Sequence, residues 1–160
     1  MKKAMTVIEL LVFMGILSVF LVILTQIFQQ SLDVQLESSA SSSVNLTGNF
    51  LLHRLEYDIR RASAITTPGA AGQTTSTLSL VIGGVTHTYA LSNSTLTLTN
   101  NLGTFAMTDP ISRISDFSVT RRGSGIGNDS LSLSFTLVSV TTTTAGTPET
   151  RQVSTTVSLR

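Results

Sequence analysis

The hydrophobic and polar positions divide the chain into an apolar N-terminal run and a longer region in which polar and apolar residues alternate. Residues 5–28 are almost all apolar, and Glu9 is the only charged residue among these 24 positions. As a helix, such a run is about 36 Å long, which exceeds a hydrocarbon core of about 30 Å. It is also longer than the apolar region of a cleaved signal peptide, about 7 to 15 residues. We therefore predict a transmembrane helix over residues 5–28.

A helical period continues beyond the apolar run. Apolar residues recur at every fourth position, the spacing of one helix face: Phe28, Leu32, Leu36 and Ala40. Five serines follow within residues 38–43, and Gly48 comes soon after. Serine side chains compete for backbone hydrogen bonds and glycine adds conformational entropy, so both are poor helix formers. The pattern predicts a bend or local melting at this place.

Residues 49–65 again have a helical pattern. Their apolar residues share one face, Leu51, Leu55, Ile59 and Ala62, and we expect this face to pack on the protein's own sheet. Glu56 lies four residues before Arg60, a spacing that favours an ion pair on the helix surface. The Pro68-Gly69 pair is a typical end to such a segment. The predicted extension of the helical spine covers residues 29–66.

After residue 74 the period changes to two, which is typical of strands. Gly83-Gly84 separates two alternating runs and predicts a tight hairpin turn. In residues 129–140 four large apolar side chains share one face, Leu131, Leu133, Phe135 and Leu137. With runs at 94–99, 111–122 and 151–159, we predict five or six mostly antiparallel strands, with loops at 123–129 and 141–148. The prediction is an α+β fold, with an antiparallel β domain over residues 74–160 lying on the helix.

Composition and charge narrow the class of protein. A formal net charge of +1, with 12% charged residues, gives no basic surface for nucleic acid. The chain has no cysteine, which excludes disulfides and thiolate metal sites. Lys2 and Lys3 precede the apolar run, and Asp33 and Glu37 follow it. The basic flank is expected on the cytoplasmic side, which predicts a single-pass membrane protein with its N-terminus inside and its C-terminal domain outside.

Glu9 is the residue that an ordinary membrane anchor does not need. A carboxylate at the centre of a bilayer costs roughly 2.5 to 3.5 kcal/mol on insertion scales, and less near the interface. Taken alone, Glu9 is either a near-interface residue that reaches the headgroups or a charge that awaits a partner.

The stretch Ala4-Met5-Thr6-Val7-Ile8-Glu9-Leu10-Leu11-Val12 resembles the signature of type IV prepilins. The resemblance implies a leader peptide over residues 1–4, with leader charges Lys2 and Lys3, and cleavage by prepilin peptidase between Ala4 and Met5. It further implies N-methylation of Met5. Glu9 is then fifth in the mature chain, where it is expected to pair with the Met5 amine of an adjacent subunit. Ala4 stands where the family usually has glycine, and Met5 where phenylalanine is commonest.

The resemblance also implies a fold, partners and a place. The expected fold is pilin-like, a long N-terminal helix packed on an antiparallel sheet. The expected partners are the peptidase, other pilins or pseudopilins, an inner-membrane assembly platform and membrane lipid, with DNA only if the filament is a competence pilus. The subunit is expected first in the inner membrane. It is then expected in a filament in the periplasm or at the cell surface.

A looser resemblance concerns the subtype. Residues 55–65 and the later strands are similar to minor pseudopilins of the J type and minor pilins of the W type. The apolar run also has no proline, and Gln26 occupies the region where many major pilins carry one. A minor subunit is therefore expected. The weak helix formers of residues 38–48 favour the same expectation. A weak place in the helix would recur in every copy of a subunit that forms the filament shaft, but it would occur only once in a subunit at the filament tip.

The sequence offers no catalytic set, so neither enzyme activity, a cofactor nor a metal is predicted. His53 and His87 are the only histidines, and both are interpreted as packing or surface residues. Oxygen ligands for calcium from Asp116, Asn128 and Asp129 lack the spacing of an EF-hand. The basic pairs at 60–61 and 121–122 are interpreted as solvated ends of elements, with the alternative that one of them contacts an acidic partner or DNA. The alternative function is a membrane-anchored extracytoplasmic binding domain or adhesin with an uncleaved signal anchor.

Overall fold

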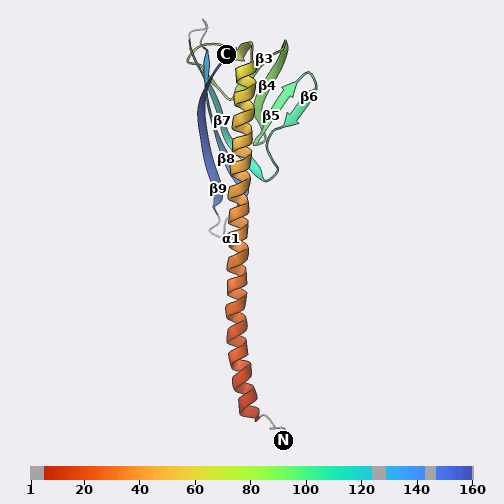
Figure 1. The fold of residues 1–160 in the computed structure, drawn as a ribbon, viewed down its shortest axis with the longest axis vertical. Helices are drawn as coiled ribbons and strands as arrows, with labels where there is room; N and C mark the ends of the chain where they lie inside the picture. Colours follow the sequence, from red (N-terminus) through yellow and green to blue (C-terminus); the bar gives the residue numbers. More distant parts are fainter. Residues whose placement is uncertain (1–5, 124–128, 143–146, 160) are drawn as a thin grey trace. The chain divides into compact units, whose positions relative to one another are not determined.

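The computed structural model describes residues 6–123, 129–142 and 147–159. In these residues one long helix is followed by nine strands, and Figure 1 shows the strands beside the C-terminal part of the helix. The elements are α1 (Val7–Arg61), β1 (Ala64–Thr67), β2 (Thr74–Thr75), β3 (Thr77–Ile82), β4 (Val85–Ser92), β5 (Thr95–Asn100), β6 (Gly103–Ala106), β7 (Ser112–Arg122), β8 (Ser130–Thr142) and β9 (Pro148–Ser158). The chain forms two compact units, divided between Leu36 and Glu37. The first holds the N-terminal turns of α1, and the second holds the remaining turns and all the strands.

The strands of the second unit form two sheets in which every paired neighbour is antiparallel. The five-stranded sheet has the order β1-β3-β4-β5-β6, and the four-stranded sheet has the order β2-β7-β8-β9. The predicted α+β class, a long N-terminal helix packed on antiparallel strands, is confirmed. The predicted number of five or six strands is wrong, because β1, β2 and β6 have only two to four residues and show no clear alternation.

One hydrophobic core joins α1 to both sheets. The predicted helix face is buried, with Leu51, Leu55 and Ile59 at most 1% exposed. The predicted face of β8 is buried as well, and the five-stranded sheet contributes Leu78, Leu80, Tyr89, Leu96 and Leu98 to the same cluster. Helix packing on the protein's own sheets is therefore confirmed for residues 49–62.

The predicted bend or melting at residues 38–48 is wrong, because α1 is a continuous helix there. Small residues of this stretch face the sheets, and Ala40, Val44 and Gly48 are buried. A Cβ on Gly48 would lie 2.9 Å from Leu137 Cδ1, so only glycine lets β8 approach this closely. Ser43 Oγ and Ser112 Oγ share a hydrogen bond of 3.0 Å. Packing on the sheets outweighs the low intrinsic helix propensity of this stretch.

The helical spine ends earlier than predicted, at Arg61 rather than at residue 66. The chain then enters β1, where Ser63 N–H donates to the Val81 carbonyl (2.8 Å) and Ile65 pairs with Leu80. β-Branched residues at 65–67 favour a strand when a partner strand is present. The partner, β3, lies more than ten residues further along the chain. A helical period reports only on neighbours within a few residues, so it could not predict this pairing.

The turns follow local chemistry. The predicted Gly83-Gly84 hairpin is confirmed, since Ile82 pairs with Val85 and the two glycines have φ values of +59° and +80°. Asn93 and Ser94 make a second turn with positive φ, which was not predicted. Of the two predicted loops, residues 124–128 and 143–146 lie outside the described residues. β8 runs to Thr142 and β9 begins at Pro148, so the second loop is shorter than predicted.

Candidate assembly sites

Helix α1 begins with a local cap. Thr6 precedes the first helical residue, and its carbonyl accepts the Leu10 N–H (3.1 Å). The Glu9 N–H donates to Thr6 Oγ1 at a long 3.4 Å. Thr6 and Glu9 have the Thr-x-x-Glu spacing of a capping box, and a carboxylate in the first turn also favours the positive end of the helix dipole. Glu9 thus contributes its backbone N–H to the cap and a negative charge to the first turn, a placement that was not predicted.

The other residues of the predicted processing site are not part of the structure described here. Lys2, Lys3, Ala4 and Met5 lie outside the described residues. Glu9 is the one member of the predicted set that can be placed, and it stands in the first turn of α1. Within residues 6–123, 129–142 and 147–159, no ion pair involves Glu9.

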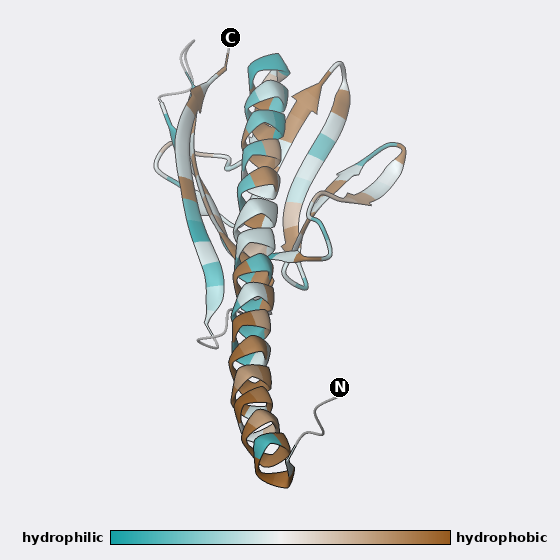
Figure 2. Ribbon diagram, turned by 60° about the horizontal axis from the view of Figure 1, so that its bottom comes forward, coloured by the Kyte–Doolittle hydropathy of each residue, from teal (hydrophilic) through white to brown (hydrophobic). Residues whose placement is uncertain are grey.

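The first unit of the chain is an exposed apolar helix. Every large apolar side chain from Val7 to Phe28 is at least 43% exposed, and hydrophobic colour dominates the N-terminal turns of α1 in Figure 2. In water this surface would be strongly unfavourable, because each large apolar side chain gains about 1.5 to 3 kcal/mol on burial. By length and composition, α1 contains one candidate membrane-spanning segment, near the N-terminus. It is consistent with a single-pass membrane anchor.

A buried polar network connects α1 to the five-stranded sheet. Asp58 is 2% exposed, and its Oδ2 accepts hydrogen bonds from the Tyr89 hydroxyl of β4 and from Arg54 Nε (3.1 Å). Burial, and next the hydrogen bond to Asp58, raise the pKa of Tyr89 above its ordinary value. The phenol therefore stays protonated as a donor at physiological pH. This network was not predicted, although Asp58 lies on the helix face of Leu55 and Ala62.

Arg121 is not a solvated strand end, and this interpretation is corrected. Its side chain is 13% exposed, and its Nη1 donates to the carbonyls of Pro68 (3.2 Å) and Gly69 (3.1 Å). Its Nη2 forms an ion pair with Asp129. The surface interpretation of Arg60 is confirmed, because it makes the predicted ion pair with Glu56 at 2.7 Å.

The candidate calcium ligands are not brought together. Asp129 forms an ion pair with Arg121 and lies next to Ser130, which pairs with Arg122 at the end of β7. Exposed Asp116 pairs with Thr136 and is therefore several residues away along the same two strands. Asn128 lies outside the described residues. Across the described ranges, no three His, Cys, Asp or Glu side chains form a group that could hold a metal ion. His53 is exposed on α1, and His87 is half-buried on β4.

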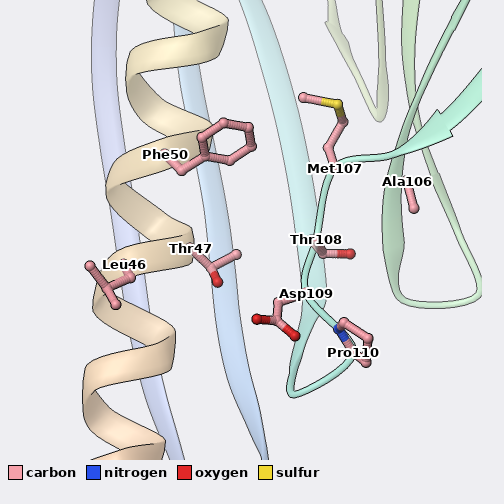
Figure 3. Close-up of a pocket in the computed structure, with 8 residues that line it drawn as sticks. All are labelled: Leu46, Thr47, Phe50, Ala106, Met107, Thr108, Asp109 and Pro110. Carbon is pink, nitrogen blue, oxygen red and sulfur yellow. The ribbon is translucent and has the colours of Figure 1, made fainter.

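Asp109 lines three adjacent hollows in the second unit, and residues of α1 line two of them. The first measures about 480 Å³ and is lined by Leu46, Thr47, Phe50, Ala106, Met107, Thr108, Asp109 and Pro110. Figure 3 shows the Asp109 carboxylate pointing toward α1, across the space from Thr47. Asp109 Oδ1 accepts the Ile111 N–H (3.1 Å), which holds the carboxylate in this orientation.

No protein-family model matches the chain, and neither a curated protein nor a solved structure matches it. The functional conclusion therefore rests on the residues of the chain and on their arrangement.

Proposed function

We propose that the chain is a prepilin-like structural subunit of a type IV pilus, a competence pilus or a type II secretion pseudopilus. In this proposal prepilin peptidase cleaves between Ala4 and Met5, and Met5 is N-methylated. Before assembly, the subunit resides in the inner membrane with its C-terminal unit outside. The assembly platform then transfers it to the filament. It is a substrate of the peptidase and catalyses no reaction.

The observation that carries the proposal is a carboxylate in the first turn of an exposed apolar helix. α1 presents apolar side chains on all sides from Val7 to Phe28, so it suits either lipid or a bundle of like helices. Glu9 is unfavourable in both settings unless a cation neutralises it. Cleavage before Met5 would create such a cation four residues away in sequence. An adjacent subunit, shifted by about 6 Å along the helix axis, would bring its amine beside Glu9.

The position of Glu9 in the first turn gives the proposal its sharpest test. Glutamine in its place keeps the backbone N–H that donates to Thr6 Oγ1, whereas pairing with an amine requires the negative charge. We expect Glu9→Gln to leave the protein inserted in the membrane and yet lower its incorporation into filaments at least about tenfold, as loss of a buried charge pair does. Asp33→Asn, on the same helix, is the matched control and is expected to assemble normally.

Membrane fractionation and immunoblots of sheared filaments measure the two effects separately. Equal incorporation of Glu9→Gln and the unaltered chain would leave Glu9 with its capping role alone. N-terminal mass spectrometry of filament protein tests the cleavage, and persistence of residues 1–4 there would contradict the processing step.

The alternative remains a membrane-anchored binding domain or adhesin with an uncleaved anchor. That function predicts a full-length chain in the membrane fraction and none in filaments. The expectation of a minor subunit now rests on the resemblance of its later segments and on the absence of proline from the apolar run, because the helix is continuous through residues 38–48.

A further inference from the structure

The hollow beside Asp109 has the properties of a receptor for a cation on an apolar stem. We name it the Asp109 groove and define it by Leu46, Phe50, Met107, Asp109 and Pro110. Leu46 and Phe50 are 68% and 54% exposed, which is unusual for side chains of this size beside a well-packed core. Within the described part of the chain, no ion pair neutralises Asp109. Covering this groove would therefore bury apolar surface and would require a positive charge.

The exposed end of α1 carries a group with the complementary properties. Arg61 lies over the ring of Tyr57, with its guanidinium carbon 5.0 Å from the ring centroid, and its Nη1 donates to the Tyr57 hydroxyl (2.8 Å). We name this pair the Tyr57–Arg61 knob. Tyr57 is 52% exposed. Arg60 next to it is paired with Glu56, whereas Arg61 has no carboxylate partner in the described ranges.

We propose that the Asp109 groove of one chain receives the Tyr57–Arg61 knob of a second copy. The stacked guanidinium is planar and held in place, so it loses little freedom on pairing with the Asp109 carboxylate. The Tyr57 ring supplies apolar surface against Leu46 and Phe50. Charge complementarity selects this occupant, because the chain itself offers an unpaired cation joined to an exposed aromatic ring.

The geometry of the contact fits an array of subunits. Groove and knob are different patches of the same chain, so the contact is head to tail, and repeating it extends an open series of copies. On α1 the knob lies 11 to 15 residues beyond Leu46 of the groove, or about 16 to 22 Å along the axis. Pairing between Met5 and Glu9 needs a shift of only about 6 Å. The two contacts therefore join each copy to different neighbours.

This inference rests on the proposed function of the chain as a filament subunit and deepens it. It places adjacent copies in the filament, and so it departs from the expectation of a minor subunit present once at a tip. A sister subunit with its own cation is the competing occupant of the groove.

Cysteine crosslinking tests the contact, because the natural chain has no cysteine. The full chain carrying Arg60→Cys and Pro110→Cys keeps Asp109, Tyr57 and Arg61 intact. In cells that contain the peptidase and the assembly proteins, a short bifunctional thiol reagent is expected to yield a ladder of dimers, trimers and higher species. Either cysteine alone yields no ladder. Arg60→Cys with Leu102→Cys is the matched control, because Leu102 is 79% exposed and lies outside the groove.

Charge reversal in the same double-cysteine chain tests the ion pair. Asp109→Arg alone and Arg61→Asp alone are each expected to lower the ladder at least about tenfold, and the two together to restore it to within about threefold. Protease resistance of the membrane-bound protein checks that each variant is folded. Restoration by the double reversal is a result that a merely structural defect would not give.

The outcomes separate this inference from the proposed function. A ladder that depends on both charges supports the contact. If the mature chain is in filaments and gives no ladder, or crosslinks only to other proteins, the contact is wrong and the proposed function stands. If the chain is uncleaved and absent from filaments and yet forms the ladder in membranes, the contact stands and the proposed function is wrong.

Discussion

Removal of one hydroxyl from the core should reveal how α1 is held to the five-stranded sheet. Tyr89 is fully buried, and its hydroxyl donates to Asp58, which is itself 2% exposed. Tyr89→Phe keeps the ring and its packing and removes only the donor. A hydrogen bond to a charged group contributes about 1.5 to 3 kcal/mol, so we expect the free energy of unfolding to fall by that amount. Tyr57→Phe alters an exposed ring and is expected to cost less than about 0.5 kcal/mol.

A double-mutant cycle shows whether the loss comes from this pair. Asp58→Leu leaves the Tyr89 hydroxyl buried without its acceptor and breaks the contact to Arg54, at an expected cost of about 3 to 5 kcal/mol. Asp58→Leu with Tyr89→Phe should cost about 1 to 3 kcal/mol less than the sum of the single changes, because neither polar group is then left alone.

The assay is urea unfolding of the full chain in mild detergent, with the folded fraction measured by a brief pulse of protease. Proteolysis reports the state of the second unit, whereas a helical signal would include the turns of α1 in the micelle. Additive single changes, or a Tyr89→Phe chain as stable as Tyr57→Phe, would show that the Tyr89 hydrogen bond does not hold the helix to the sheet.

Three further outcomes are expected in the same assay. The pKa of Tyr89 in the folded chain is above its ordinary 10.0, so above about pH 10 the phenol of the unfolded chain loses its proton first. The free energy of unfolding therefore falls as the pH rises, and Tyr89→Phe should remove the share of this fall that comes from Tyr89. Gly48→Val should cost about 1 to 3 kcal/mol through overpacking against Leu137, whereas Gly15→Val, which meets no atom within 4 Å, should leave the second unit unchanged. Arg121→Lys should cost about 1 to 2 kcal/mol by loss of its forked contacts, and exposed Arg122→Lys less than about 0.5 kcal/mol.

The two polar anchors of α1 explain how one helix serves both sheets. Asp58 connects it to β4 of the five-stranded sheet. Arg151 of β9 in the four-stranded sheet donates to the side-chain oxygens of Asn45 (2.8 Å) and Asn49 (3.2 Å) on α1. Apolar packing alone is non-directional and would tolerate sliding of the helix. Hydrogen bonds at two levels of the helix fix its position along its axis.

Local periodicity and turn chemistry are enough to predict several features of this fold. The apolar run, the buried face of Leu51, Leu55 and Ile59, and the alternation of β8 follow from the repeat of side-chain direction along a helix or a strand. The Gly83-Gly84 turn follows from the positive φ that two glycines adopt without strain. Each of these features involves residues that are close in the chain, so a single sequence is enough to predict it.

Other features depend on contacts between residues that are far apart in the chain. Residues 38–48 remain helical because β7, β8 and β9 pack on them, and residues 64–67 become a strand because β3 is beside them. Asp58 finds Tyr89 across 31 residues, and Arg121 reaches Pro68 across 53. The groove at Asp109 exists only because the segment after β6 passes beside α1. Such contacts gain free energy from burial and hydrogen bonding between distant residues, and this gain outweighs the modest local propensities that a sequence pattern reports.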